Sequence, residues 1–311
     1  MPRYRRKKFE RESTLYLSTL HIRPFIQENG NIKGYRGIKR HLGGHSGFLG
    51  NVLGCQDVIV KNLVLYFGRP TNRNTHNLSW EYWKTLLKGS GNTYAFPKIE
   101  LCFPDINTYS HYSRLSMRSK YWQPYFSDLM KRTSQISVDN LNIEKEDLLI
   151  KTKHIRDKLH WNWTAFPTPL DDERLDYIKE QLYLVKSATI LTPKSSLSAK
   201  EIGATISLYM TLKNKLPKIL VKKVRIDPCL KATASYFKSD YGCDANVSTC
   251  CVWPNGVATG CPHHPNPDYK GVVRNVDKMK LLLHRCRNRY DFDACPLPVV
   301  YPEIRKKIVK A

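Results

Sequence analysis

A large excess of positive charge is the feature that most constrains this chain. Its 311 residues contain 51 Lys and Arg against 27 Asp and Glu, a formal net charge of +24. Self-repulsion of this size opposes compaction unless a polyanion neutralises it. Nucleic acid meets that need, because each phosphate that is neutralised releases a counterion and adds affinity. We therefore expect nucleic acid, as single-stranded DNA or RNA, to be the partner.

The charge is unevenly distributed along the chain. Residues 1–138 carry 22 basic and 8 acidic side chains, whereas residues 139–180 carry 7 and 10. The remaining residues are again strongly basic, with 22 basic and 9 acidic side chains. This pattern divides the chain into a basic arm (1–12), a basic Gly- and aromatic-rich region (13–138), a near-neutral helical segment (139–198) and a basic C-terminal region (199–311) with a strand pair and many Cys and His residues.

The cations that we expect to contact nucleic acid lie in the arm, in a glycine-rich segment, in an aromatic-rich segment and in the strand pair. They are Arg3, Arg5, Arg6, Lys7, Lys8, Lys33, Arg36, Lys39, Arg40, Arg114, Arg118, Lys120, Lys213, Lys215, Lys218, Lys222, Lys223 and Arg225.

Two of these segments have a second interpretation. Residues 30–54 contain eight of the sixteen glycines, and such a segment is equally well explained as a flexible connector, since no phosphate-binding signature is present. Residues 109–132 mix aromatic and basic side chains, as surfaces that stack single-stranded bases do. For this segment we favour a core in which the aromatic rings are buried and the Arg and Lys side chains face outward.

Hydrophobic periodicity predicts several elements of secondary structure. A strand or helical turn is expected at 15–20, a short helix at 78–88, and the best-supported helix at 171–185, where Leu175, Ile178, Leu182 and Val185 share one face. Strands are predicted at 58–67, 94–103, 204–212 and 218–226. In the second of these, Ile99, Leu101 and Phe103 alternate with Glu100 and Cys102. We expect the last two to form a hairpin.

Cysteine and histidine residues cluster near the C-terminus. Thiolate and imidazole are the ligands that Zn²⁺ prefers, so this cluster suggests a structural zinc site. The paired C-x2-C knuckles typical of zinc ribbons are missing, and buried or free reduced thiols explain the cluster as well. The candidate metal ligands are Cys243, Cys250, Cys251, Cys261, His263 and His264.

Signs of catalysis, export and membrane insertion are weak or missing in the sequence. The order His263-His264, Asn275, His284 is similar to that of HNH nucleases, but the flanking CxxC pairs and acidic partners of that motif are lacking. No other catalytic signature stands out, so we assign no catalytic residue and expect a protein that is not an enzyme. Neither a secretory signal nor a run of about eighteen apolar residues is present, which predicts a protein that is neither secreted nor membrane-bound.

The head of the chain, Pro2-Arg-Tyr-Arg-Arg-Lys-Lys8, resembles the basic arms of capsid proteins from small circular single-stranded DNA viruses. In that family the arm neutralises packaged genome and directs nuclear import. The resemblance implies a virion protein that reaches the host nucleus, assembles into homo-oligomers and has a jelly-roll-like body. We therefore expect an α+β or mainly β fold with a helical insertion, and a capsid or nucleoprotein function. The alternatives are a ribosomal or ribonucleoprotein subunit that binds RNA, located inside the cell, and an HNH-like metal-dependent nuclease.

Overall fold

The structure is a computed structural model that describes residues 15–22, 58–67, 98–118, 123–139, 151–164, 170–192, 199–233, 249–252, 257–259 and 271–272. Its strands are β1 (Leu15–Ile22), β2 (Val58–Tyr66), β3 (Lys98–Phe103), β4 (Thr133–Asp139), β5 (Leu159–Thr164), β6 (Ser187–Leu191), β7 (Val224–Ile226), β8 (Thr249–Val252), β9 (Val257–Thr259) and β10 (Gly271–Val272). Its helices are α3 (Ile106–Arg118), α4 (Gln123–Arg132), α6 (Asp172–Leu184), α7 (Ala199–Lys215), α8 (Lys218–Val221) and α9 (Pro228–Thr233).

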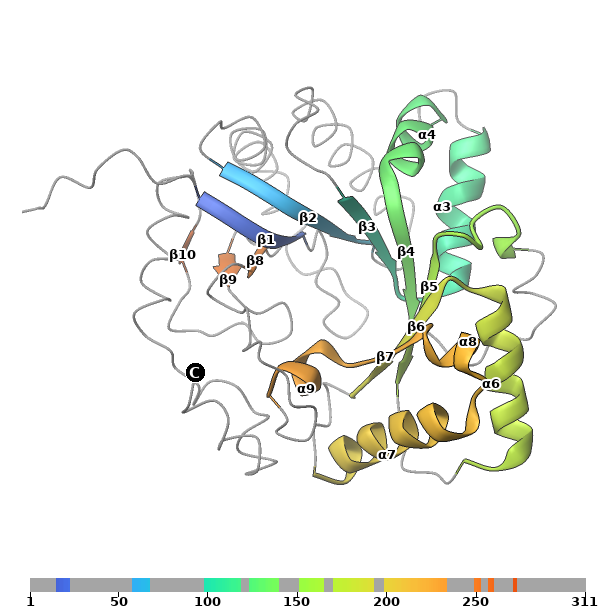
Figure 1. Cartoon of the computed structure of the whole chain (residues 1–311). Coiled ribbons are helices and arrows are strands. Elements are labelled where there is room, and N and C mark those ends of the chain that lie inside the picture. The colour runs from blue at the N-terminus through green and yellow to red at the C-terminus, as the bar shows by residue number, and fades with distance from the viewer. Residues whose placement is uncertain are drawn as a thin grey trace, which may run out of the picture.

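One sheet organises the described part of the chain (Figure 1). Its strand order is β10-β9-β8-β1-β2-β3-β4-β5-β6-β7, so β1 to β7 follow one another in sequence order. Each neighbouring pair from β1 to β7 is parallel, and β8 joins the free side of β1, again in parallel. Within the described sheet, β9 pairs antiparallel with both of its neighbours, β8 and β10. Parallel neighbours need a crossover connection. Described helices lie in three of these connections: α3 and α4 between β3 and β4, α6 between β5 and β6, and α7 and α8 between β6 and β7.

The sheet has one apolar face, which the helices cover. Side chains alternate between the two faces of a strand, so the apolar residues of β2 to β7 fall on the same side. That side carries Leu63, Leu65, Phe67, Ile99, Leu101, Phe103, Ile136, Val138, Leu159, Trp161, Trp163, Ala188, Ile190, Val224 and Ile226, all of them buried. Residues of α3, α4, α6 and α7 belong to the same core cluster, so the helices pack on this face.

The best-predicted helix, at 171–185, is confirmed as α6. Asp171 caps its N-terminus by accepting a hydrogen bond from the backbone N–H of Arg174 at 2.8 Å. The expected apolar stripe is buried, with Leu182 completely inaccessible to solvent. The negative charges of Asp172 and Glu173 in the first turn stabilise the helix, because they lie at the positive end of its dipole.

The strands predicted at 58–67 and 94–103 are also confirmed, as β2 and β3, and the segment at 15–20 is strand β1. In β3 the expected alternation is present: Ile99, Leu101 and Phe103 are buried, whereas Glu100 and Cys102 are half-buried on the other face. The helix predicted at 78–88 lies outside the described residues.

The hairpin predicted at 204–212 and 218–226 is wrong. The first segment belongs to helix α7, and the second contains helix α8 followed by the short strand β7. Ile202, Thr205 and Leu212 are the buried residues of α7, and this spacing is helical. A window that starts at residue 204 leaves out Ile202, and the remaining apolar run is then indistinguishable from a strand.

The predicted fold class, an α+β or mainly β body of the jelly-roll type, is also wrong. A jelly roll is built from antiparallel strands, whereas the sheet here is parallel from β8 through β1 to β7 and curls into a half-barrel with helices on one face. The strands of this sheet come from three of the compositional segments, 13–138, 139–198 and 199–311. The described part of the chain is therefore an α/β structure.

Candidate active site on the polar face of the sheet

The second face of the sheet is lined by polar and ionisable side chains. We call it the polar face. By register and alternation it includes His21, Tyr66, Glu100, Cys102, Gln135, Ser137, Asp139, His160, Asn162, Ser187, Thr189 and Arg225. Polar residues in the middle of parallel strands are unusual, because such strands are normally apolar throughout. Each of the seven strands contributes a polar side chain to this face, and the apolar Val64 lies between His21 and Glu100 in the register. This polar lining marks the face as the candidate site.

Glu100 is the centre of one hydrogen-bonded cluster on this face. Its Oε1 accepts hydrogen bonds from Gln135 Nε2 at 3.1 Å and from the hydroxyl of Ser137, and it lies 3.6 Å from the thiol of Cys102. The amide of Gln135 also contacts Ser137 Oγ at 3.0 Å. Among the described residues, none donates a hydrogen bond to Oε2 of Glu100. The carboxylate is therefore fixed in orientation through one oxygen while its second oxygen is left available.

His160 is the centre of a second cluster, on β5 and β6. Its Nδ1 lies 2.7 Å from Ser187 Oγ and its Nε2 lies 2.9 Å from Thr189 Oγ1. Burial lowers the pKa of His160 to about 4, and the positive charge of Arg225 contributes in the same direction. The imidazole is therefore neutral at pH 7, with one nitrogen donating and the other accepting.

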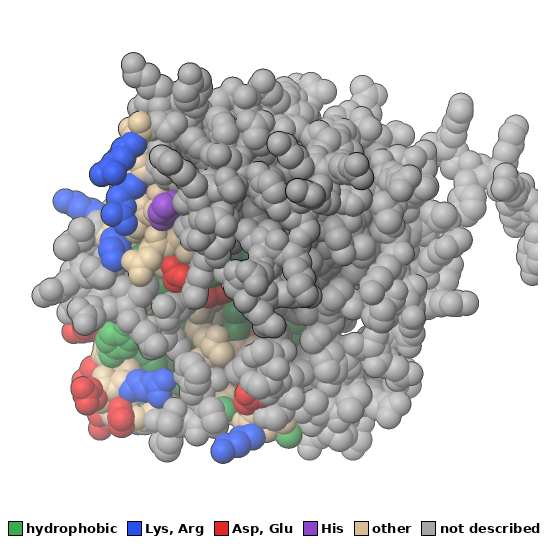
Figure 2. Space-filling view, turned by 180° about the vertical axis from the view of Figure 1, so that it is seen from behind, with side chains coloured by type: hydrophobic (Ala, Val, Ile, Leu, Met, Phe, Trp, Pro, Cys, Tyr) green, Lys and Arg blue, Asp and Glu red, His purple; other side chains and the backbone are tan. Residues whose placement is uncertain are grey.

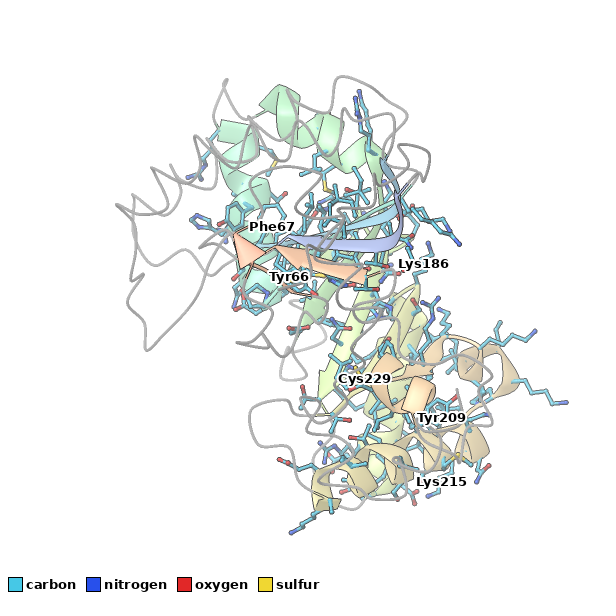
Figure 3. The ribbon with its side chains drawn as sticks, turned by 90° about the vertical axis from the view of Figure 1, so that its left-hand side faces the viewer. Tyr66, Phe67, Lys186, Tyr209, Lys215 and Cys229 are labelled. Carbon is cyan, nitrogen blue, oxygen red and sulfur yellow. The ribbon has the colours of Figure 1, made fainter. Side chains whose placement is uncertain are left out.

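His21 and Tyr66 form a third cluster, near the C-terminal ends of β1 and β2. His21 Nδ1 lies 3.2 Å from Tyr66 Oη, and the two rings are stacked with centroids 5.9 Å apart. The next residue, Phe67, packs instead against Phe103 in the apolar core (Figure 3). In the register of the sheet, Tyr66 is directly opposite Cys102, so its phenol stands one strand away from the Glu100 cluster.

Two aspartates at the C-terminal edge of the sheet have structural roles. Asp105 accepts a hydrogen bond from the backbone N–H of Thr108 at 2.6 Å and so caps α3. Asp227 is buried after β7, and it accepts from the backbone N–H groups of Thr192 at 3.1 Å and Cys229 at 2.9 Å. These hydrogen bonds join the ends of β6 and β7 to the start of α9.

The cations predicted to contact nucleic acid are placed in different environments. Arg114 and Arg118 are exposed on α3, Lys213, Lys215, Lys218 and Lys222 are exposed on or next to α7 and α8, and Arg225 is exposed on β7. Lys223 is instead engaged, because its ammonium donates to two carbonyl oxygens at the end of α6. The remaining predicted cations, in the arm, in the glycine-rich segment and at Lys120, lie outside the described residues.

The aromatic residues of the 109–132 segment that the structure describes are core residues. Tyr109 and Tyr112 are completely buried, whereas Arg114 and Arg118 are exposed. This arrangement agrees with the favoured interpretation of this segment as a core with outward-facing cations.

The candidate zinc ligands lie mostly outside the described residues. Cys250 and Cys251 belong to β8, where Cys251 is buried and pairs in register with His21. Cys243, Cys261, His263 and His264 are not described, and within the described residues no group of three or more His, Cys, Asp or Glu side chains is arranged to hold a metal. The zinc site therefore stays a prediction. The residues of the HNH-like order, His263, His264, Asn275 and His284, are outside the described part as well.

Sequence reasoning missed Glu100, Gln135, Ser137 and His160 as functional candidates. The signal was present in β3, where Glu100 and Cys102 alternate with buried apolar residues. The same alternation is present in β4, where Gln135 and Ser137 alternate with Ile136 and Val138, and in β5, where His160 alternates with Leu159 and Trp161. Only the parallel pairing of these strands shows that their polar residues share one face.

Comparison with known proteins gives little guidance. No protein-family model and no curated protein matches the chain. Among solved structures, it is similar to the crystal structure of Streptococcus suis SuiB bound to precursor peptide SuiA, with 12% identity and a TM-score of 0.38. The match covers 80% of this chain and 60% of the SuiB chain. A similarity of this size establishes neither a shared fold nor a shared function.

The expectation of a structural nucleic-acid-binding protein, whether a capsid protein, a nucleoprotein or a ribonucleoprotein subunit, is corrected here. The capsid resemblance implied a jelly roll in a virion, and the observed body is instead a parallel α/β sheet with a polar face rich in reactive groups. The described helices include none with the length and apolar character needed to cross a bilayer.

Proposed function

We propose that the chain is an enzyme whose active site is the polar face of the sheet, with Glu100 as its general base. The observation that supports this proposal is the orientation of the Glu100 carboxylate. Oε1 receives hydrogen bonds from Gln135 and Ser137 and a contact from Cys102, while Oε2 receives none from the described residues. A general base needs this geometry, namely a fixed carboxylate with an oxygen free to take a proton.

The position in the fold supports the same proposal. In parallel α/β sheets and barrels, active sites lie at the carboxyl ends of the strands. A polar row of Tyr66, Cys102, Ser137 and His160 runs next to Glu100, in register across β2 to β5. Tyr66, Cys102 and Ser137 lie toward the carboxyl ends of their strands. Tyr66 is polarised by its contact with His21 and lies opposite Cys102 of the Glu100 cluster in the register, so we assign it the role of proton donor.

The proposed reaction is proton abstraction from an acidic C–H bond of a polar substrate. Glu100 Oε2 takes the proton, and Tyr66 donates a proton to the oxygen on which negative charge develops. His160 keeps its hydrogen bonds to Ser187 and Thr189 and is neutral at pH 7, so it adds no charge to the polar face. Proton transfer by a positioned side chain contributes roughly 10²–10⁴-fold to a rate.

Exchange of substrate hydrogen for deuterium tests this proposal, and it does so even while the substrate is unidentified. The protein is incubated in D2O with a defined library of amino acids, sugar phosphates, keto acids and short peptides, and mass spectrometry detects compounds that gain deuterium. We expect at least one compound to exchange with the wild type and to exchange at least about 100-fold more slowly with Glu100→Gln.

The matched control is Glu173→Gln, the same substitution at an exposed position on α6. This variant should exchange at the wild-type rate. Tyr66→Phe should reduce the rate as well, because it removes the phenol proton. If the wild type exchanges none of the compounds, or if Glu100→Gln exchanges at the wild-type rate, Glu100 is not a general base.

A further inference from the structure

A stripe of basic residues runs along the outward face of α3. Residues spaced by three or four positions lie on the same side of a helix. One such set, with spacings of four, three and four, is Asn107, His111, Arg114 and Arg118. The buried side of the same helix carries Tyr109 and Tyr112, so the stripe faces away from the core.

The turn at residues 151–158 adds further cations to this surface. Lys151 Nζ donates to Asn107 Oδ1 at 3.0 Å, and His154 Nε2 lies 2.8 Å from Tyr109 Oη. The turn is anchored by Ile155, which is buried in the core. Lys153, between these anchored residues, is exposed. The turn therefore lies against α3 and presents its positive charge beside the helix.

This surface is predominantly positive. Residues 106–118 and 151–158 contain six Lys and Arg against one acidic residue, Asp157. Neither Arg114 nor Arg118 forms an ion pair with a residue that the structure describes. Figure 2 shows Lys and Arg side chains gathered in a column over α3 and the adjoining turn, away from the acidic residues of α6. We call Arg114, Arg118, Lys151 and Lys153 the basic stripe.

We propose that the basic stripe docks the phosphate backbone of a nucleic acid. From Asn107 to Arg118 the helix advances about 16 Å, at roughly 1.5 Å per residue. One strand of a duplex presents about five phosphates over that length. Guanidinium groups match phosphate with paired hydrogen bonds, and the regular spacing of phosphates suits a rigid helix better than irregularly spaced carboxylates of an acidic peptide would.

This inference goes beyond the proposed catalytic site. The stripe lies on the helix-covered side of the sheet, whereas Glu100 lies on the polar face. It also assigns the nucleic-acid binding that the net charge predicts to one surface of the molecule. The contacts are with the backbone only, so binding should be independent of base sequence.

The dependence of affinity on salt tests this docking surface. Fluorescence anisotropy measures binding of the full chain to a labelled duplex DNA of about 20 base pairs and to a single-stranded RNA of about 20 nucleotides. For the Arg114→Gln/Arg118→Gln variant, the slope of log K against log salt should become shallower by about 1.8 for duplex and about 1.4 for the single strand, since two phosphate contacts are lost. Arg118→Gln alone should produce half of this change.

The matched control is Lys179→Gln/Lys200→Gln, which removes the same charge from α6 and α7. Lys179 forms an ion pair with Asp176 at 2.8 Å and neither residue belongs to α3 or the adjoining turn, so this pair should leave the slope unchanged. Equal slope changes in both double variants would show that only net charge matters and would overturn the proposal. So would a wild type that binds neither probe at about 50 mM salt, or stronger binding to polyglutamate than to either probe, which would indicate an acidic peptide.

Discussion

At the scale of single residues, buried polar side chains are the main finding. His160 is 3% exposed, and both of its ring nitrogens have hydroxyl partners. An unfolded histidine has a pKa near 6.5, and burial lowers that of His160 to about 4 in the folded protein. Between pH 4 and pH 6.5 the unfolded chain binds a proton that the folded protein does not. The contribution of neutral His160 to the free energy of unfolding is therefore fully present above about pH 6.5 and is lost as the pH is lowered toward 4.

The corresponding prediction concerns His160→Gln. At pH 7 the variant should be less stable than the wild type, because the imidazole hydrogen bonds are lost. At pH 4.5 the difference in the free energy of unfolding should shrink by about 2–3 kcal/mol, since only the wild type carries the cost of a histidine that stays unprotonated. Urea unfolding of both proteins at the two pH values measures this. A difference that is the same at both pH values would contradict the low pKa.

At the scale of elements, a lysine from the turn before β7 completes the end of helix α6. The ammonium of Lys223 donates to the carbonyl oxygens of Leu182 at 2.7 Å and Val185 at 2.8 Å, where α6 has no further helical partners for them. Burial lowers the pKa of Lys223, but the two carbonyls and the negative end of the helix dipole favour its charged form. This contact fixes α6 to the start of β7.

We therefore predict that Lys223→Met destabilises the protein by about 1–2 kcal/mol, because two carbonyl groups lose a charged donor. Lys222→Met is the matched control, since the neighbouring lysine is exposed, and it should change stability by less than about 0.5 kcal/mol. Thermal and urea unfolding of the two variants distinguishes these outcomes. Equal effects would show that the contacts with α6 contribute nothing.

At the scale of the whole molecule, the two faces of the sheet have different roles. The apolar face is covered by helices and forms the core, whereas the polar face holds the candidate catalytic groups. The C-terminal segment completes the sheet through β8, which pairs with β1 and places Cys251 beside His21 in the register. A metal near β8 would therefore act on the β1 side of the sheet and leave β5 to β7 unaffected.

The zinc prediction can be tested at this scale. If the site exists, purified protein contains about one equivalent of zinc, and Cys261→Ser and His263→Ala each remove it, whereas Cys55→Ser does not. Chelation should then increase hydrogen exchange in β8 and β9 but not in β5 and β6, since metal binding and local folding are linked. Elemental analysis that finds no zinc in protein prepared without chelator would mean that these cysteines are reduced thiols.

The sequence by itself determined the features that depend on neighbouring residues. The period-2 pattern of β3, the apolar run of β2 and the capped stripe of α6 each identify their element, because the signal lies within one segment. The charge distribution likewise follows from composition alone. The exposed cations of α3 were anticipated too, because in a segment whose aromatic rings are buried the charged side chains are expected to face solvent.

Only the tertiary structure decided the order of the strands, the helical state of α7 and the polar face. The parallel pairing of β1 to β7 joins segments far apart in the chain, so no local pattern reports it. Glu100, Ser137 and His160 are isolated polar residues in three separate strands, and they become one site only when the register brings them together. The resemblance of the basic arm to viral capsid proteins misled the fold prediction for the same reason, because an arm of about ten residues carries no information about how distant strands pair.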